Sequence, residues 1–455
     1  MKEAYRILPV YAGDVSGIAS ALYELGGMVV IHDPSGCNST YNTHDEIRWY
    51  DQESHIFISG LNMRDAVLGN DQKFISDIVE AAGQIYPKPA FIAICNSPVP
   101  YLNGTDFHGI CRIVEKRCGI RTFYVPSNGM HDYVRGAGRA FLEYARAMLP
   151  APCPAAVPVR GPAAIPEPGS ADGSASYSAA DSVSGPAADP VSDPALCSAG
   201  SESGRIRVCV LGATPLTYGN RQSVPNLRRI LESSGFCVTA VWAMGSTPEE
   251  IDRSTDSDVN LVISDTGILA ARYLKETYGI PYVTGVPVSR RVWAALKKKL
   301  REAVRLRRTD GTELEPVSGS GNEGKSGTLS VYIGEAILSA SLAASGDGQG
   351  MVLCPFADSR SLLAPGDRFF DGEEELLAQI ASVQARNPNI RIELWADPMY
   401  RTVLPESLTF HPLPTLALSG RLYRTHFPDY FGWTADEASG SIRHMTKYDG
   451  MYGNV

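Results

Sequence analysis

Short apolar runs alternate along most of the chain with longer segments in which apolar residues recur at helical spacing. The apolar runs are rich in Val, Ile and other residues that favour strands. The predicted strands are 27–33, 89–95, 121–126, 206–212, 237–243, 260–265, 280–285, 328–334, 351–356 and 391–397. The predicted helices lie near 14–25, 72–86, 105–118, 135–149, 222–234, 267–278, 335–345 and 373–385. Strands separated by helices predict an α/β fold of parallel sheets flanked by helices on both faces.

Two polar stretches divide this pattern into three blocks. In residues 151–200, 35 of the 50 positions are Ala, Pro, Ser or Gly, too few apolar groups to offset the entropy of ordering. We therefore expect a disordered linker over 150–204 and a second, flexible linker over 309–327. The blocks predict three Rossmann-like domains, over 1–149, 205–308 and 328–455, the last including a C-terminal segment.

Composition narrows the class of protein. The 455 residues carry a formal net charge of -9, which disfavours a general nucleic-acid binder because phosphate contacts need a basic face. The N-terminal sequence does not resemble a signal peptide, and no run of about 18 apolar residues predicts a membrane span. Nine cysteines at irregular spacing favour a reducing, cytoplasmic setting with free or metal-bound thiols.

One stretch matches the Walker A pattern of nucleotide-binding loops, from Gly319 to Lys325 and Ser326. That loop normally follows a strand and precedes a helix, so that backbone N–H groups cradle the phosphates. Here polar, irregular sequence precedes the match and a strand-like run follows it. A flexible linker explains these glycines better, and a P-loop nucleotide-binding protein remains an alternative that Lys325→Ala would test.

A basic run stretches from Lys297 to Arg308 through sequence of helical character. Its simplest interpretation is a solvated helix face, and the alternative is a surface that docks an acidic partner.

Two cysteines follow neighbouring apolar strands of the first block. Cys37 comes after the strand at 27–33 through the turn Pro34-Ser35-Gly36, and Cys95 closes the strand at 89–95. The carboxyl edge of an open α/β sheet is where ligands bind, and thiolates are the usual ligands of iron–sulfur clusters. Either cysteine could instead be a small buried apolar residue.

The remaining cysteines and the histidines carry less information. Cys111 and Cys118 fall in a predicted helix, and Cys209, Cys237 and Cys354 fall in predicted strands, so all five are expected in the core. No histidine pair has metal-binding spacing, although His32 and His44 bracket Cys37 and His108 follows Cys95. A structural role, with hydrogen bonds satisfied by neighbours, is the default for each.

The sequence around these cysteines resembles the component 1 type oxidoreductases of the nitrogenase family. This family includes the α and β chains of nitrogenase and the dark-operative protochlorophyllide reductase. The residues that carry the resemblance are YAG at 11–13, VIHDPSGC at 30–37, MRDAVLGND at 63–71, Cys95, SNG at 127–129, VRG at 134–136 and the strand–helix–GIP pattern of 260–282. The similarity covers most of 6–149 and 205–300, and extends more faintly over 328–433.

The resemblance implies a cytoplasmic iron–sulfur oxidoreductase that works as a dimer. Cys37 and Cys95 would be cluster ligands, and two cysteines from each of two chains would supply the four thiolates of one [4Fe–4S] cluster at the subunit interface. The mate would be a second copy or a related component 1 chain. Electrons would come from an ATP-hydrolysing iron–sulfur reductase and pass to an unknown substrate in the cleft among the three domains.

Departures from the family qualify this expectation. Nitrogenase brings three cysteines per subunit to the interfacial cluster, and the first would fall near Pro9 here, which cannot ligate iron. The cysteine that anchors the large nitrogenase cofactor would fall at Ser264 or Asp265, so dinitrogen reduction is not expected. Candidate pocket residues near the cluster are His32, Asn38, His44 and Asn96. The alternative is a metallocluster carrier or assembly scaffold without turnover.

Overall fold

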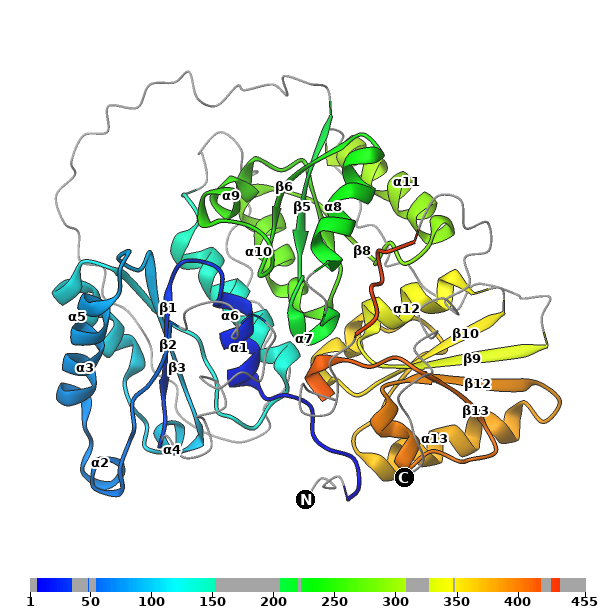
Figure 1. Ribbon diagram of the computed structural model, residues 1–455, viewed down its shortest axis with the longest axis horizontal. Coiled ribbons are helices and arrows are strands. Elements are labelled where there is room, and N and C mark those ends of the chain that lie inside the picture. Colours follow the sequence, from blue (N-terminus) through cyan, green and yellow to red (C-terminus); the bar gives the residue numbers. More distant parts are fainter. Residues whose placement is uncertain are drawn as a thin grey trace.

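Three parallel sheets build the molecule (Figure 1). The structure is a computed structural model, and it describes residues 6–34, 48, 55–151, 205–219, 222–307, 327–346, 348–418 and 427–433. Every pairing between the described strands is parallel, as the alternation of strands and helices predicted. The two predicted linkers lie almost wholly outside the described residues, as do Cys37, Asn38, His44 and the Walker A match.

The first sheet has the strand order β2-β1-β3-β4. Its strands are β1 (Met28–His32), β2 (Ile56–Ile58), β3 (Phe91–Asn96) and β4 (Arg121–Tyr124). Its helices are α1 (Asp14–Leu22), α2 (Met63–Leu68), α3 (Asp71–Gln84), α4 (Pro98–Leu102), α5 (Phe107–Cys118) and α6 (Tyr133–Met148). The sequence did not predict β2, because three residues are too short a run to stand out from a loop.

Successive side chains of β1 point to opposite faces of this sheet, and both faces are apolar. Val29 and Ile31 join a cluster with α1 and α6, whereas Met28 and Val30 join another with α3 and α5. Because side chains of successive strand residues point to opposite faces, each residue at the end of β1 or β3 is assigned to one side of the sheet.

The second sheet repeats the same local order, β6-β5-β7-β8. Its strands are β5 (Ile206–Leu211), β6 (Phe236–Val241), β7 (Val259–Val262) and β8 (Tyr282–Thr284). Its helices are α7 (Pro215–Tyr218), α8 (Ser223–Ser233), α9 (Pro248–Asp252), α10 (Ile268–Tyr278) and α11 (Arg290–Arg307). Cys237 is exposed on the edge strand β6, so the expectation that it lies in the core is wrong. Cys209, on the central strand β5, is buried as expected.

The third sheet has the order β11-β10-β9-β12-β13. Its strands are β9 (Thr328–Ile333), β10 (Gln349–Cys354), β11 (Arg368–Phe369), β12 (Arg391–Ala396) and β13 (Thr409–Pro412). The helices are α12 (Ala336–Ser345) and α13 (Glu373–Arg386). In each sheet the chain starts at an inner strand, builds outward on one side and then crosses to the other, which creates a topological switch point.

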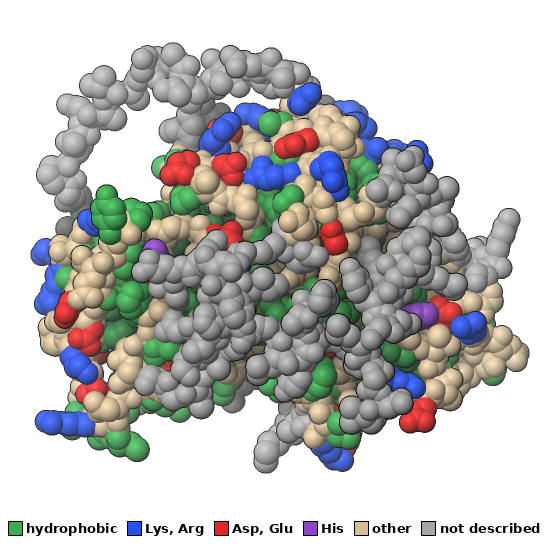
Figure 2. All heavy atoms as spheres, in the orientation of Figure 1, with side chains coloured by type: hydrophobic (Ala, Val, Ile, Leu, Met, Phe, Trp, Pro, Cys, Tyr) green, Lys and Arg blue, Asp and Glu red, His purple; other side chains and the backbone are tan. Residues whose placement is uncertain are grey.

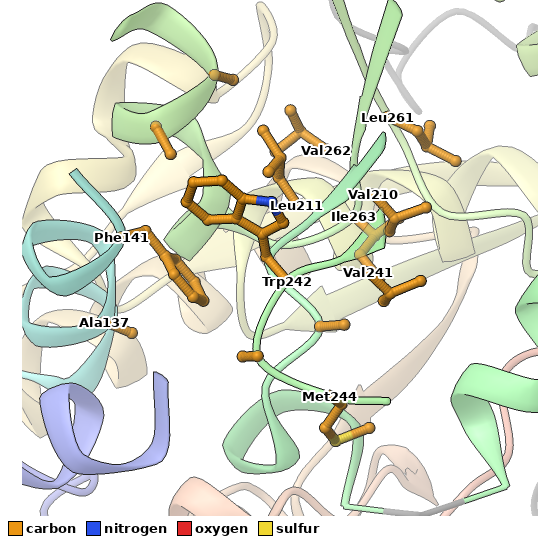
Figure 3. Packing of buried hydrophobic residues seen from close by; sticks show 14 of the residues in the cluster. Ala137, Phe141, Val210, Leu211, Val241, Trp242, Met244, Leu261, Val262 and Ile263 are labelled. Carbon is orange, nitrogen blue, oxygen red and sulfur yellow. The ribbon is translucent and has the colours of Figure 1, made fainter. Parts of the chain in front are cut away.

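The first and second sheets share one hydrophobic core. Figure 3 shows Ala137 and Phe141 of α6 facing Trp242, which lies just beyond β6. The Phe141 and Trp242 rings meet edge to face with 5.9 Å between centroids, and the indole Nε1–H donates to Ser254 Oγ at 2.8 Å. Because this tryptophan is fully buried, it anchors α6 against the second sheet.

The basic helix α11 buries an apolar stripe that includes Leu296 and Leu300, while Lys298 and Arg301 are exposed. Figure 2 shows Lys and Arg side chains gathered over this upper part of the molecule. The predicted helix is confirmed, and the exposed charges match the solvated-face interpretation. No helix among the described residues is long and apolar enough to cross a membrane.

Candidate functional site

Cys95 lies at the carboxyl end of the first sheet, beside its topological switch point. It is the penultimate residue of β3, which extends one residue further than predicted, and it pairs in register with Ile31 of β1. Its thiol belongs to the apolar cluster on the α1 and α6 side of the sheet and is fully buried. The predicted partner ligand, Cys37, follows β1 but lies outside the described residues.

Two acidic residues stand close to the Cys95 thiol. Burial raises its pKa well above the usual range, and the carboxylates of Asp14 and Asp33 raise it further. Asp14 opens α1 and Asp33 directly follows β1, and both are buried. A free thiolate is therefore disfavoured here, whereas a positively charged centre bonded to the sulfur would be favoured.

Close packing of α1 against α6 holds Asp14 in place. A Cβ atom on Gly136 would come within 1.9 Å of the Asp14 carbonyl oxygen, and one on Gly17 within 2.4 Å of the Tyr133 carbonyl oxygen. The two helices can touch at this distance only through glycine. The Asp14 carboxylate then accepts hydrogen bonds from the backbone N–H groups of Asn128 and Gly129, which fastens the loop after β4 beside the Cys95 edge.

The pocket candidates His32 and Asn96 point to the opposite face from Cys95. The His32 ring stacks on Phe74 with 3.9 Å between centroids, and its Nδ1 lies 2.8 Å from Ser59 Oγ. Burial lowers the pKa of His32 to about 4, against an opposing effect of Asp65. The Asn96 side chain accepts a hydrogen bond from Tyr124 Oη at 2.6 Å and donates one to the Ser97 carbonyl. The structure therefore brings these two residues together, away from the Cys95 thiol.

Ser97 carries an orphaned polar atom at the same edge. Its Oγ is buried and has no hydrogen-bond partner in the described part of the chain. A buried hydroxyl without a partner costs about 1–3 kcal/mol and usually marks a missing water, ion or ligand. The buried Cys95 lies two residues before it in the chain, at the same edge of the sheet. No group of three or more His, Cys, Asp or Glu side chains among the described residues could hold a metal alone.

An apolar patch lies on the surface at this edge. It consists of Met63, Val67 and Leu68 of α2, Tyr101 and Leu102 of α4, and Met130. Met63 is 82% exposed and Leu102 is 77% exposed, and α2 buries none of its residues. Asn103 ties α4 to α2 by donating to the Ala66 carbonyl at 2.6 Å, and Figure 2 shows apolar side chains over α2 at the lower left. Such a patch marks an interaction surface.

A second polar centre, which the sequence did not predict, lies among elements that flank the three sheets. The buried Glu335 directly precedes α12, and its carboxylate accepts four hydrogen bonds. The donors are Tyr133 Oη at 2.5 Å, Thr217 Oγ1 at 2.6 Å, Ser264 Oγ at 2.6 Å and the Asp265 backbone N–H at 3.0 Å. We call these five residues the polar joint, because they tie α6 beside the first sheet, and α7 and the segment after β7 beside the second sheet, to the start of α12 beside the third sheet.

Asp265 completes the polar joint from the other side. Its carboxylate accepts hydrogen bonds from the backbone N–H groups of Ala336 and Ile337, so it caps α12. Burial and the neighbouring Glu335 raise its pKa to about 7. Ser264 and Asp265 stand where a cofactor-anchoring cysteine would be expected, and the joint uses both of them. Each follows the end of β7, so the strand-end rule that singled out Cys95 could have found them.

Comparisons with known proteins agree with this fold. A sequence profile described as "Nitrogenase component 1 type Oxidoreductase" matches residues 23–315. One component chain of the light-independent protochlorophyllide reductase of Methylobacterium radiotolerans is 36% identical over 89 residues, which cover 19% of this chain and 17% of that protein. The corresponding chain of Prochlorococcus marinus strain MIT 9312 is 30% identical over 112 residues, 24% of this chain and 21% of that protein. These matches thus span about a fifth of each relative.

Solved structures match over nearly the whole chain at low identity. A structure titled "Nitrogenase Cp1 at pH 6.5" aligns with a TM-score of 0.57 and 13% identity, covering 98% of this chain and 93% of that one. A second, "Nitrogenase Cp1 at pH 5", aligns with a TM-score of 0.56 and 14% identity, covering 95% and 88%. At such identities the likeness shows a shared fold.

Proposed function

The chain belongs to the nitrogenase component 1 type oxidoreductase family, and from this premise we propose that it is an iron–sulfur subunit that relays electrons to a substrate. The observation that carries the proposal is the place of Cys95, buried at the switch point of the first sheet with an orphaned Ser97 hydroxyl beside it. Cys95 and Cys37 would hold the cluster, and a second copy of the chain would supply the other two thiolates. The bound cluster would supply one-electron redox chemistry.

The chain's own residues would tune that centre. Asp14 and Asp33 place negative charge beside the Cys95 sulfur, which stabilises an oxidised, more positive centre. The unpaired Ser97 hydroxyl could donate a hydrogen bond to a sulfur atom of the bound cluster, and such a bond would stabilise the reduced state. The covering core, including Ile31 and Val29, keeps water away from the Cys95 side of the sheet.

The apolar patch fits the electron donor. We assign it to docking an ATP-hydrolysing iron–sulfur reductase, because it lies at the same sheet edge as Cys95 and α4 begins three residues after that cysteine. Electron transfer needs the donor close to the acceptor, and an exposed apolar surface lets a partner dock and leave.

Electron paramagnetic resonance of anaerobically purified protein tests the cluster. The wild type should be coloured and should give a signal on one-electron reduction, and Cys95→Ala and Cys37→Ala should lose both. Cys111→Ala is the matched control, because Cys111 is also buried in the first domain but lies on α5. A signal that survives in Cys95→Ala would contradict the proposal.

Stopped-flow oxidation of the reduced iron–sulfur reductase, with ATP, tests the docking surface. Leu68→Glu and Leu102→Glu should slow oxidation roughly tenfold or more, because each puts a charge into an apolar contact. Tyr86→Glu is the control, since Tyr86 is 94% exposed but precedes β3 at the opposite, amino edge of the sheet. Wild-type rates in both patch variants would rule this surface out.

Measuring substrate turnover distinguishes the proposed reductase from the alternative, an assembly scaffold. With the reductase and ATP present, a reductase consumes substrate over many cycles. A scaffold instead transfers its cluster to an acceptor protein and consumes no substrate.

A further inference from the structure

Two Asn–Gly pairs occur in the chain, and one of them borders the apolar patch. Asn103 and Gly104 directly follow α4, whereas Asn128 and Gly129 lie in the loop after β4. A glycine after an asparagine leaves its main-chain nitrogen open to attack the asparagine side chain, because glycine has no side chain to hinder the approach. Both pairs therefore have the sequence for a spontaneous modification, and the surrounding structure determines which of them can react.

The first pair is exposed and loosely held. Asn103 and Gly104 both face solvent. Gly104 has a φ of 67°, and a Cβ atom placed on it would meet nothing within 4 Å, so this turn has room to rearrange. The main-chain N–H of Gly104 donates to the Tyr101 carbonyl at 3.3 Å, which is long for such a bond. The nitrogen that would attack is therefore only weakly restrained.

The second pair is fastened at the corresponding atoms. The main-chain N–H of Gly129 donates to both oxygens of the buried Asp14 carboxylate, at 3.1 and 3.2 Å. The Asn128 side-chain oxygen accepts a hydrogen bond from the Met130 main-chain N–H at 3.0 Å. A Cβ atom on Gly129 would come within 2.7 Å of Pro98, so this turn is tightly packed. Asn128–Gly129 is thus a control within the same chain that the fold protects.

The Asn103 side chain also joins the two helices of the apolar patch, which lie at the lower left of Figure 1. Its Nδ2 donates to the Ala66 carbonyl of α2 at 2.6 Å. Since α2 buries none of its residues, this bond is a main tie between α2 and α4. A single exposed bond opens often enough for the side chain to react. An aspartate at position 103 would have no N–H to donate, and its charge would face the Ala66 carbonyl oxygen.

We propose that Asn103 is a spontaneous deamidation site whose conversion releases α2 from α4. The Gly104 nitrogen loses its proton and bonds to the side-chain carbonyl carbon of Asn103, the bond from that carbon to Nδ2 breaks, and ammonia leaves. Water then opens the cyclic succinimide to aspartate or to isoaspartate, in which the main chain runs through the side-chain carbon. Water is the only co-reactant. The reaction and the release of α2 are independent of the proposed function, and only the effect on docking rests on it.

Peptide mapping by mass spectrometry, on protein aged at mildly alkaline pH, tests the site. The peptide that contains Asn103 should gain the mass of an amide converted to a carboxyl group, and should contain isoaspartate, roughly tenfold faster than the peptide with Asn128. Gly104→Asn should slow the conversion, because asparagine tolerates a positive φ but its side chain hinders the attack. Conversion at Asn128 as fast as at Asn103, or no conversion at Asn103, would overturn the proposal.

Hydrogen exchange read by mass spectrometry tests the release of α2. Asn103→Asp, which mimics one product, should speed exchange of the α2 amides roughly threefold or more. Gln84→Glu is the control, because it makes the same amide-to-carboxyl change at an exposed position on α3. Unchanged α2 exchange in Asn103→Asp would overturn the release.

Stopped-flow oxidation of the reductase then measures the effect on docking. Asn103→Asp and aged wild type should react roughly threefold or more slowly than fresh wild type, and aged Gly104→Asn should keep its rate. A full rate in aged, fully converted protein would overturn the effect on docking. Fresh wild type that does not oxidise the reductase at all would refute the proposed docking function instead, because the mass and exchange measurements need no reductase.

Discussion

At the three-domain junction the Glu335 carboxylate accepts four hydrogen bonds, whereas at the carboxyl edge of the first sheet the Ser97 hydroxyl is buried with no partner among the described residues. The two regions occupy equivalent places, because each lies at a topological switch point, where the order in which the chain adds strands to a parallel sheet reverses. The fold has used the Glu335 region to fasten domains together. At the first-sheet edge one buried hydroxyl, that of Ser97, has no partner among the described residues, and an exposed apolar patch lies at the same edge, as expected where a ligand and a partner bind.

Removing the Glu335 carboxylate should have the largest effect on stability. Glu335→Ala leaves four donors without their acceptor, and the Asp265 backbone N–H cannot turn to another. The free energy of unfolding, measured with denaturant, should fall by roughly 2–4 kcal/mol. Glu374→Ala is the control, because Glu374 forms a surface ion pair with Arg6 and should matter by less than about 1 kcal/mol. Equal losses in the two variants would show that the joint does not fasten the domains.

The pH dependence of stability should carry the signature of Asp265. Its folded pKa is raised from 3.8 to about 7, so the folded state binds the proton more tightly than the unfolded state. This contribution is fully present below about pH 4 and is lost as the pH rises through about 7. Asp265→Asn should therefore flatten the fall in unfolding free energy between those values. An unchanged profile would show that the carboxyl is ionised throughout.

The sequence could predict the parts of both regions that lie directly after a strand. The apolar runs identified nearly every long strand, and the turn after 27–33 together with Cys95 pointed to the first-sheet edge. Applied to the other sheets, the same rule would have marked Ser264, Glu335 and Asp397, each directly or closely behind a strand. The sequence could not predict that these residues lie close together, because their proximity depends on how the three sheets pack against one another.

The direction in which side chains point was the second property of the site that the sequence could not predict. His32 and Cys95 both stand at the carboxyl edge, yet they face opposite sides of the sheet because Ile31, not His32, pairs with Cys95. Strand register depends on pairing across some sixty residues, which local sequence does not specify. The exposed patch on α2 was equally hidden, since its residues look like the core of an ordinary helix.

Ser97→Ala should cause the smallest loss of stability. The hydroxyl has no partner to lose among the residues that the structure describes, and burying it unpaired is costly, so the free energy of unfolding should not fall and should rise by roughly 1 kcal/mol. The reduction potential of the bound cluster should fall, because a hydrogen bond to sulfur favours the reduced state. Redox titration followed by electron paramagnetic resonance measures this shift. A clear loss of stability with an unchanged potential would place Ser97 in the packing of the fold and not beside a cluster.

Counting iron and acid-labile sulfide per particle, by native mass spectrometry on oxygen-free preparations, tests the central claim most directly. The account predicts a particle of two chains that carries about four iron and four sulfide, the content of one [4Fe–4S] cluster. Cys95→Ala should lose them and Cys111→Ala should keep them. A colourless single chain without iron, or full iron content in Cys95→Ala, would contradict the account.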